Sequence, residues 1–179
     1  MMPDQIERLH DEIRKVSDIS LGFHGHDNLG LAMWNSLKAA ELGFEFIDCS
    51  LQGMGRSSGN VSTELFAINA QKFGYDINMD IHRLFEISKK YVYPLVRKIN
   101  PIDTMCGYTG FHTSYLGAIH RVAGKFGVNP LRLMEKYTQY DQINMDEIKL
   151  EEIAKQLPED LESLAIADFR GYFGNEQSI

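Results

Sequence analysis

The amino-acid sequence predicts an α/β fold in its first half, followed by a small helical region. Helix-like and strand-like patterns alternate through residues 1–75, as expected for parallel strands covered by helices. Each strand-like pattern runs into a segment rich in glycine and polar residues, and ligands bind at that end of a parallel strand. Beyond this part only helical patterns recur. We therefore expect three regions, 1–75, 76–157 and a tail of unassigned role at 158–179.

The composition is that of an ordinary globular protein. The chain has 179 residues, of which 44% are hydrophobic and 24% charged, enough for a core. A net charge of −7 argues against binding to nucleic acid or to a membrane surface, and no apolar run approaches the ~20 residues of a membrane span. No signal-peptide pattern is visible, and Cys49 and Cys106 are too few for a disulfide framework. We expect a cytoplasmic protein with reduced thiols.

The first expected helix covers residues 3–15. Ile6, Leu9 and Ile13 recur at three- to four-residue spacing, and Pro3 suits the first turn of a helix. This pattern predicts one apolar face that packs on the strands that follow.

Four further elements complete the α/β part. An amphipathic pattern predicts a helix over 29–42, which Gly43 would end. The mostly apolar stretch 44–51 predicts a strand that is buried on both faces. A glycine-rich turn at 53–59 then leads into a helix over 61–73.

The second half is predicted to be helical. Helices are expected at 79–92, 114–126, 131–140 and 146–157. Between the first two, Asn100-Pro101 indicates a break, and the chain from residue 106 is expected to begin as a loop.

Two histidines mark the end of the first strand. The segment Gly22-Phe-His-Gly-His-Asp-Asn-Leu-Gly30 follows an apolar lead-in, so His24 and His26 lie at a strand exit and point to the same side. Two imidazoles on one side suit a metal ion, although surface histidines in a loop are the alternative. A divalent ion wants at least three protein ligands. Asp27 could be a ligand or a helix cap, and Asn28 competes for the capping role.

A second segment, Gly53-Met-Gly-Arg-Ser-Ser-Gly-Asn60, follows the second strand. Its glycines, including Gly55, allow close approach of the backbone to a ligand. Asn60 could cap the next helix or reach a metal ion, and Arg56 could pair with a substrate carboxylate or be an ordinary exposed arginine. Asp48 could hold a histidine tautomer or bond to the backbone.

Together, Phe23-His-Gly-His-Asp-Asn-Leu-Gly-Leu31 and Phe46-Ile-Asp-Cys-Ser-Leu-Gln-Gly-Met-Gly-Arg-Ser-Ser-Gly-Asn60 resemble the metal-dependent aldolase and lyase superfamily. The superfamily has a (β/α)8 TIM-barrel fold and includes 4-hydroxy-2-oxovalerate aldolase, which this chain resembles most, and hydroxymethylglutaryl-CoA lyase. The resemblance runs from residue 3 to about 157. It implies the C-terminal part of such a barrel, with its last two strands, followed by a small helical domain.

The resemblance implies retro-aldol cleavage of a 4-hydroxy-2-oxo acid to pyruvate and an aldehyde. His24 and His26 would be two of three protein ligands of Mn²⁺ or Mg²⁺, which would bind the 2-keto acid and stabilise the pyruvate enolate. The position of a substrate-contacting tyrosine in the family falls at His112, with Tyr108 four residues earlier. These two side chains are therefore the expected substrate contacts in the second half.

The Arg-x-Asp block of the family's first strand has no counterpart in this sequence. We therefore expect the chain to need a missing N-terminal half or self-association, because an open sheet leaves strand edges unpaired. In the family the helical part packs beside an acylating aldehyde dehydrogenase, which is another expected partner. The alternatives are a catalytically inactive remnant or protein-interaction module, and a Claisen-type lyase or synthase acting on an acyl-CoA. The absence of a cysteine at 53–59 argues against the hydroxymethylglutaryl-CoA lyase branch.

Overall fold

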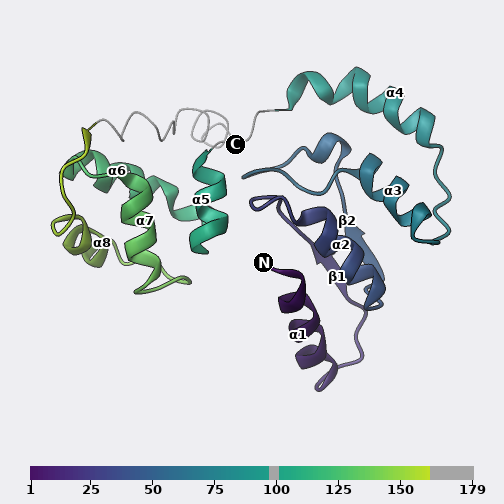
Figure 1. The fold of residues 1–179 in the computed structure, drawn as a ribbon, viewed down its shortest axis with the longest axis horizontal. Coiled ribbons are helices and arrows are strands. Elements are labelled where there is room, and N and C mark those ends of the chain that lie inside the picture. The colour runs from purple at the N-terminus through teal and green to yellow at the C-terminus, as the bar shows by residue number, and fades with distance from the viewer. Residues whose placement is uncertain (97–100, 162–179) are drawn as a thin grey trace. The chain divides into compact units, whose positions relative to one another are not determined.

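The structure, a computed structural model, describes residues 1–96 and 101–161 (Figure 1). They belong to two compact units, Met1–Ile99 and Asn100–Ile179. The division falls later than the boundary expected after residue 75, because the helix that follows that boundary packs within the first unit. Within the described ranges, no helix has both the length and the apolar character needed to cross a membrane.

The first unit alternates helices and strands, as the sequence predicts. Its elements are α1 (Pro3–Arg14), β1 (Gly22–His24), α2 (Ala32–Glu41), β2 (Phe46–Asp48), a 3-10 turn (Leu51–Gly53), α3 (Thr63–Lys72), α4 (Ile81–Tyr91) and a 3-10 turn (Tyr93–Leu95). The two strands pair in parallel, with Gly22 opposite Phe46 and His24 opposite Asp48. Helix α2 connects the two strands and, like α1 beside it, belongs to this unit (Figure 1). This arrangement confirms the α/β class.

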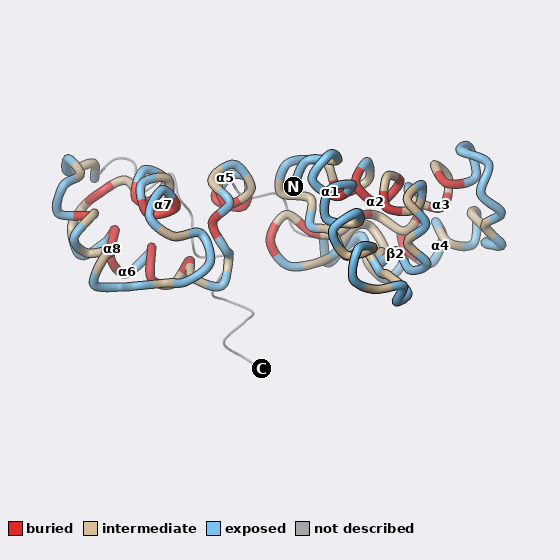
Figure 2. Tube along the Cα trace, turned by 90° about the horizontal axis from the view of Figure 1, so that it is seen from below, coloured by how far each residue is buried: buried red, intermediate tan, exposed pale blue. Residues whose placement is uncertain are grey.

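The expectation that the second strand is buried on both faces is wrong. Strand β2 has only three residues, and Phe46 is 61% exposed while Ile47 is partly buried. In Figure 2 the buried segments of this unit lie mainly on the helices, whereas β2 is exposed or intermediate. The physical reason is that the sheet has two strands in the described part of the chain, so nothing there covers the second face. An isolated two-stranded sheet is at best marginally stable in water.

The helix ends follow the local signals in the sequence. Gly43 and Gly74 stand directly after α2 and α3 with positive φ values of 85° and 92°, where a side chain would be strained. At the start of α4, the Asp80 carboxylate accepts a hydrogen bond of 3.0 Å from the Arg83 backbone N–H. These caps place the helix boundaries within a few residues of the predicted ones.

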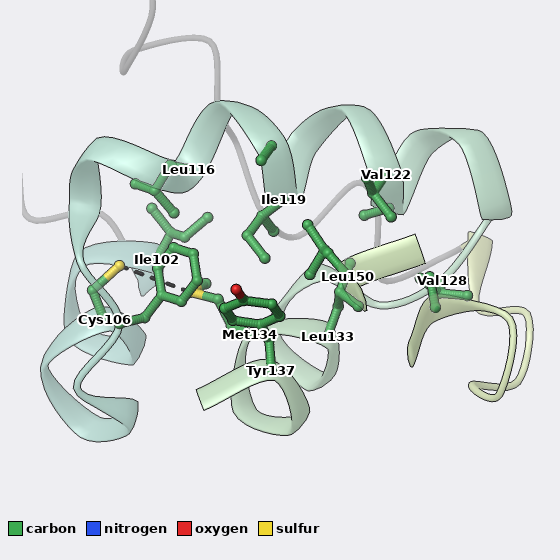
Figure 3. Packing of buried hydrophobic residues seen from close by; sticks show 14 residues of the cluster. Ile102, Cys106, Leu116, Ile119, Val122, Val128, Leu133, Met134, Tyr137 and Leu150 are labelled. Carbon is green, nitrogen blue, oxygen red and sulfur yellow. Dashed lines mark hydrogen bonds between the residues drawn. The ribbon is translucent and has the colours of Figure 1, made fainter. Parts of the chain in front are cut away.

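The second unit is helical, as predicted, and has its own core. Its helices are α5 (Pro101–Thr109), α6 (Leu116–Phe126), α7 (Pro130–Thr138) and α8 (Glu147–Ala154), with a 3-10 turn (Thr113–Tyr115). Side chains from all four helices meet in one buried cluster (Figure 3). Its fully enclosed members include Ile102, Leu116, Ile119, Leu133, Met134, Tyr137 and Leu150.

Helix α5 corrects the expectation of a loop from residue 106. Ile102 and Cys106 lie one helical turn apart and are 0% and 3% exposed, so burial of this face stabilises the helix. Pro101 begins the helix, and Gly110, with φ of 75°, follows its end. The sequence Cys-Gly-Tyr-Thr-Gly resembles a loop by composition, but packing overrides that local preference.

Candidate metal centre

His24 and His26 lie side by side at the end of β1. Their ring centroids are 5.1 Å apart and the rings are nearly perpendicular, at 83°. A metal ion lies about 2.1 Å from a ligating ring nitrogen, so two imidazoles that bind one ion at right angles have centroids roughly 4.5–5 Å apart. The observed pair is close to that spacing, and both residues are exposed at the surface of the unit.

An oxygen atom faces the Nδ1 atom of each histidine. The Asp48 carboxylate lies 3.2 Å from His24 Nδ1, because the strand register sets these two residues opposite each other. The backbone carbonyl of Gly59 lies 3.3 Å from His26 Nδ1. In a neutral imidazole an acceptor at Nδ1 selects the form with the proton on that atom, which leaves the lone pair of Nε2 available to a ligand. Of the two roles left open for Asp48, the structure therefore supports contact with the histidine.

Asp27 supports helix α2 at its start. Its Oδ1 atom accepts a hydrogen bond of 2.8 Å from the backbone N–H of Ala32. Asn28, the competing candidate, instead donates from Nδ2 to the Ser57 hydroxyl at 2.6 Å. The N-cap position of α2 is occupied by Leu31, which makes no side-chain cap, so neither candidate is the N-cap residue; Asp27 accepts from the first helical N–H and Asn28 does not.

The glycine-rich segment brings Asn60 beside the histidines. Asn60 forms an antiparallel bridge with His26, and its Nδ2 donates to the Met54 carbonyl at 3.4 Å. A Cβ on Gly55 would lie 2.6 Å from Asn60 Nδ2, so any side chain at this position would displace the Asn60 amide. Asn60 Oδ1 is buried and accepts no hydrogen bond from the described residues. Helix α3 is capped by Ser62 rather than by Asn60, which leaves the amide oxygen of Asn60 available to bind a metal ion.

These groups are too few to hold a metal ion by themselves. Within residues 1–96 and 101–161, no three His, Cys, Asp or Glu side chains gather closely enough to hold an ion. Burial and the neighbouring Asp48 carboxylate raise the pKa of the Cys49 thiol to about 11, so it is protonated at neutral pH. The two histidines and the Asn60 oxygen fit a divalent cation, but such an ion needs at least one more ligand.

The remaining predicted site residues lie apart along the chain. Arg56 is exposed on the glycine-rich segment. Tyr108, on α5 of the second unit, is 69% exposed. His112 precedes the 3-10 turn of that unit, where its Nδ1 accepts from the Ser114 backbone N–H at 3.3 Å. Tyr108 and His112 thus belong to the second unit, and the histidine pair belongs to the first.

Sequence reasoning missed Glu64, a buried carboxylate behind the site. It is 1% exposed and accepts hydrogen bonds from the Gln52 backbone, the Gln52 side chain and the Ser62 hydroxyl. Burial raises the pKa of this carboxyl, but hydrogen bonds from Ser62, Ser88 and Gln52 outweigh that effect and lower the pKa to about 2. The sequence feature that could have drawn attention to Glu64 is its position in the first turn of a helix, two residues after a capping serine.

The depressed pKa of Glu64 predicts acid-sensitive stability. Since its pKa rises to an ordinary value near 4.5 on unfolding, the stabilisation is present above pH 4.5 and is lost as the pH falls toward 2. At about 1.4 kcal/mol per pKa unit, the free-energy advantage of the wild type over Glu64→Gln shrinks by at most about 3 kcal/mol across this range. Urea denaturation at several pH values measures this difference. Glu7→Gln, on the exposed side of α1, is the control, and an equal pH dependence in both variants would contradict the prediction.

Comparison with protein families gives a match to the family described as HMGL-like, over residues 1–90. Among curated proteins, the chain is 35% identical over 138 residues to 4-hydroxy-2-oxovalerate aldolase of Desulfitobacterium hafniense. It is 33% identical over 148 residues to 4-hydroxy-2-oxovalerate aldolase 4 of Rhodococcus opacus. These alignments cover 75% and 81% of this chain but 41% and 43% of the relatives. The chain thus spans about two fifths of their length.

A solved structure is also similar. It is the N-terminal domain of a candidate aldolase from Bacteroides vulgatus, with a TM-score of 0.58 and 26% sequence identity. The match covers 79% of this chain and 42% of that one. The similarity therefore extends beyond the residues matched by the family model.

Proposed function

The chain belongs to the HMGL-like family, and we propose that it forms part of a divalent-metal-dependent aldolase that cleaves a 4-hydroxy-2-oxo acid to pyruvate and an aldehyde. The observation that supports this most is the pair of neighbouring histidines whose Nδ1 atoms both face oxygen acceptors, which leaves the lone pairs of their Nε2 atoms available to a ligand. The names of the curated relatives supply the reaction class.

In this proposal each residue of the site has a distinct task. His24, His26 and the Asn60 amide oxygen hold Mn²⁺ or Mg²⁺, and the cation supplies Lewis-acid catalysis when bound. Asp48 fixes the tautomer of the first histidine. Arg56, exposed on the same segment, pairs with the carboxylate of the 2-keto acid.

The second unit has two proposed tasks. Tyr108 and His112 contact the substrate, the first from an exposed position on α5 and the second from the turn that follows it. The helical surface of this unit is also the proposed contact with an acylating aldehyde dehydrogenase.

We propose that the remaining metal ligand comes from a polypeptide equivalent to the other three fifths of the relatives. Three features of the first unit support this. Its sheet has two strands in the described residues, Phe46 is 61% exposed beside the site, and the histidine pair lacks a carboxylate ligand there. Strands added beside β1 and β2 would cover these surfaces and complete a (β/α)8 barrel.

Complementation tests the proposal directly. The chain would be combined with Mn²⁺ and the three fifths of the Desulfitobacterium hafniense relative that the alignment leaves unmatched, and pyruvate release would be followed with 4-hydroxy-2-oxovalerate as substrate. We expect activity from the mixture that a chelator removes and Mn²⁺ restores. A stable complex with no metal-dependent activity would refute the catalytic proposal and favour a protein-interaction role.

Replacement of Asp48 by Asn tests the proposed control of the histidine tautomer. An amide can present its NH₂ group to Nδ1 and so favour the wrong tautomer of His24. Loss of such a supporting partner lowers metal affinity by about 10- to 100-fold, so we expect Mn²⁺ affinity of the complemented protein to fall in this range. Calorimetric titration measures it, with Asp76→Asn, on an exposed stretch of the same unit, as control. Equal affinities in the two variants would remove Asp48 from the site.

A further inference from the structure

We propose that Glu64 is a positioning residue for His26. The Glu64 carboxylate holds the glycine-rich segment, and that segment orients His26. This inference rests on the proposed function, because it treats His26 as a metal ligand. Glu64 lies on α3 and, within the described part of the chain, makes no hydrogen bond to either histidine. Its effect would reach His26 through the backbone of residues 52–60.

The first link joins the carboxylate to Gln52. The Gln52 backbone N–H lies 3.1 and 3.0 Å from the two carboxylate oxygens of Glu64, and the Gln52 side-chain amide donates to Oε1 at 2.9 Å. Gln52 has φ of 56°, in the left-handed region that non-glycine residues rarely adopt. A backbone in this region persists when surrounding contacts hold it, and the buried carboxylate supplies those contacts.

The second link joins this turn to His26. The carbonyl of Gly53, next to Gln52, accepts a hydrogen bond of 2.9 Å from the Asn60 backbone N–H. A Cβ on Gly59 would collide with that same carbonyl, so the two sides of the segment are in close contact. The Gly59 carbonyl then accepts from the backbone N–H of Asp27 at 2.9 Å and faces His26 Nδ1 at 3.3 Å. The acceptor that sets the His26 tautomer is therefore placed by the turn that Glu64 holds.

Two serines complete the network around the carboxylate. The Ser62 hydroxyl donates to Glu64 Oε2 at 2.6 Å, and the Gln52 side-chain amide also donates to the Ser88 hydroxyl of α4 at 2.6 Å. Ser88 is 0% exposed, so this contact fastens the turn to a packed helix. His24 is different, because its acceptor is Asp48 on β2 and not part of the glycine-rich segment. A change at Glu64 should therefore affect His26, and His24 serves as the internal reference.

Nuclear magnetic resonance of the metal-free chain tests the proposal. In the wild type, the ¹⁵N shifts of both rings should report a proton on Nδ1. In Glu64→Gln, an amide replaces one of the two acceptor oxygens, so we expect His26 to become a tautomer mixture while His24 stays unchanged. The substitution weakens the hydrogen bonds from Gln52 to the charged carboxylate, which hold the turn. Hydrogen exchange at the backbone amides of Asn60 and Asp27 should therefore accelerate by roughly tenfold or more. Glu7→Gln, which neutralises an exposed glutamate on α1 of the same unit, should change exchange less than about threefold.

Several outcomes would overturn the proposal. It fails if the His26 shifts in folded Glu64→Gln match the wild type, if both histidines change together, or if Glu7→Gln has the same effect. Should Glu64→Gln not fold, Glu64→Asp, which keeps the charge on a shorter side chain, takes its place and should affect His26 but not His24. All readings are taken without metal, so absence of Mn²⁺ binding in a separate titration of the complemented protein would refute the proposed function and leave the Glu64 result intact.

Discussion

The double variant His24→Ala/His26→Ala is expected to lose Mn²⁺ affinity by more than ~1000-fold in the complemented protein, since loss of even an outer partner of a ligand costs about 10- to 100-fold. The two rings lie 5.1 Å apart and supply both nitrogen ligands of the proposed centre. No other described pair of histidines has its rings in contact. Calorimetric titration measures the affinity, and pyruvate release should fall with it.

The matched control is His82→Ala/His120→Ala, which also removes two exposed histidines, one from α4 and one from α6. It should bind Mn²⁺ like the wild type. Equal binding by both double variants would mean that the ion lies elsewhere and would refute the proposed centre. The chain alone could also bind Mn²⁺, with binding lost only in the His24/His26 variant. That result would identify self-association as the source of the missing ligand. Gel filtration with Mn²⁺ would detect the assembly.

The part of the site that depends on strand geometry was predictable from sequence. Side chains alternate along a strand, so His24 and His26 had to lie on one side once the apolar lead-in identified the strand. The position of Asp48 followed less directly, because it depends on the register between β1 and β2, which no local pattern specifies. From the sequence, Asp48 could either hold a histidine tautomer or bond to the backbone, and the structure was needed to choose between these two roles.

Burial was harder to predict because it depends on what covers a surface. The stretch 44–51 is apolar enough for a strand buried on both faces. In the described part of the chain, however, Phe46 remains 61% exposed because neighbouring residues cover only part of this strand. The opposite error occurred at Cys106, where glycines and a threonine suggest a loop but the face shared with Ile102 is buried. In both places tertiary contacts, rather than local preference, determine the outcome.

Glu64 was missed for a related reason. A glutamate in the first turn of a helix ordinarily faces water, where it interacts with the helix dipole. Its burial here depends on Gln52, twelve residues earlier, which turns its backbone N–H and its side chain toward the carboxylate. A contact made by a left-handed turn has no periodic signature in sequence, so such a residue is found only from the structure.

Leu133→Ala is expected to lower the free energy of unfolding by about 2–5 kcal/mol, the range for leucine-to-alanine changes in packed cores. Leu133 is 0% exposed on α7 and lies in the cluster with Ile119 and Leu150 (Figure 3). Urea denaturation followed by far-ultraviolet circular dichroism measures the loss. Ile148→Ala is the control, because Ile148 is 77% exposed on α8 and its loss should change stability by less than about 0.5 kcal/mol.

The comparison of Leu133→Ala with Ile148→Ala tests whether the stability of the helical unit depends on its own core. A domain of this size has a total stability of only about 5–15 kcal/mol, so a loss at the upper end of the range would unfold a large fraction of it. Tyr108 and His112 lie on or directly after α5, which contributes Ile102 and Cys106 to the same core. If Leu133→Ala and Ile148→Ala were equally stable, the cluster would not be what holds these helices together, and a fixed position for the two proposed substrate contacts would need another source.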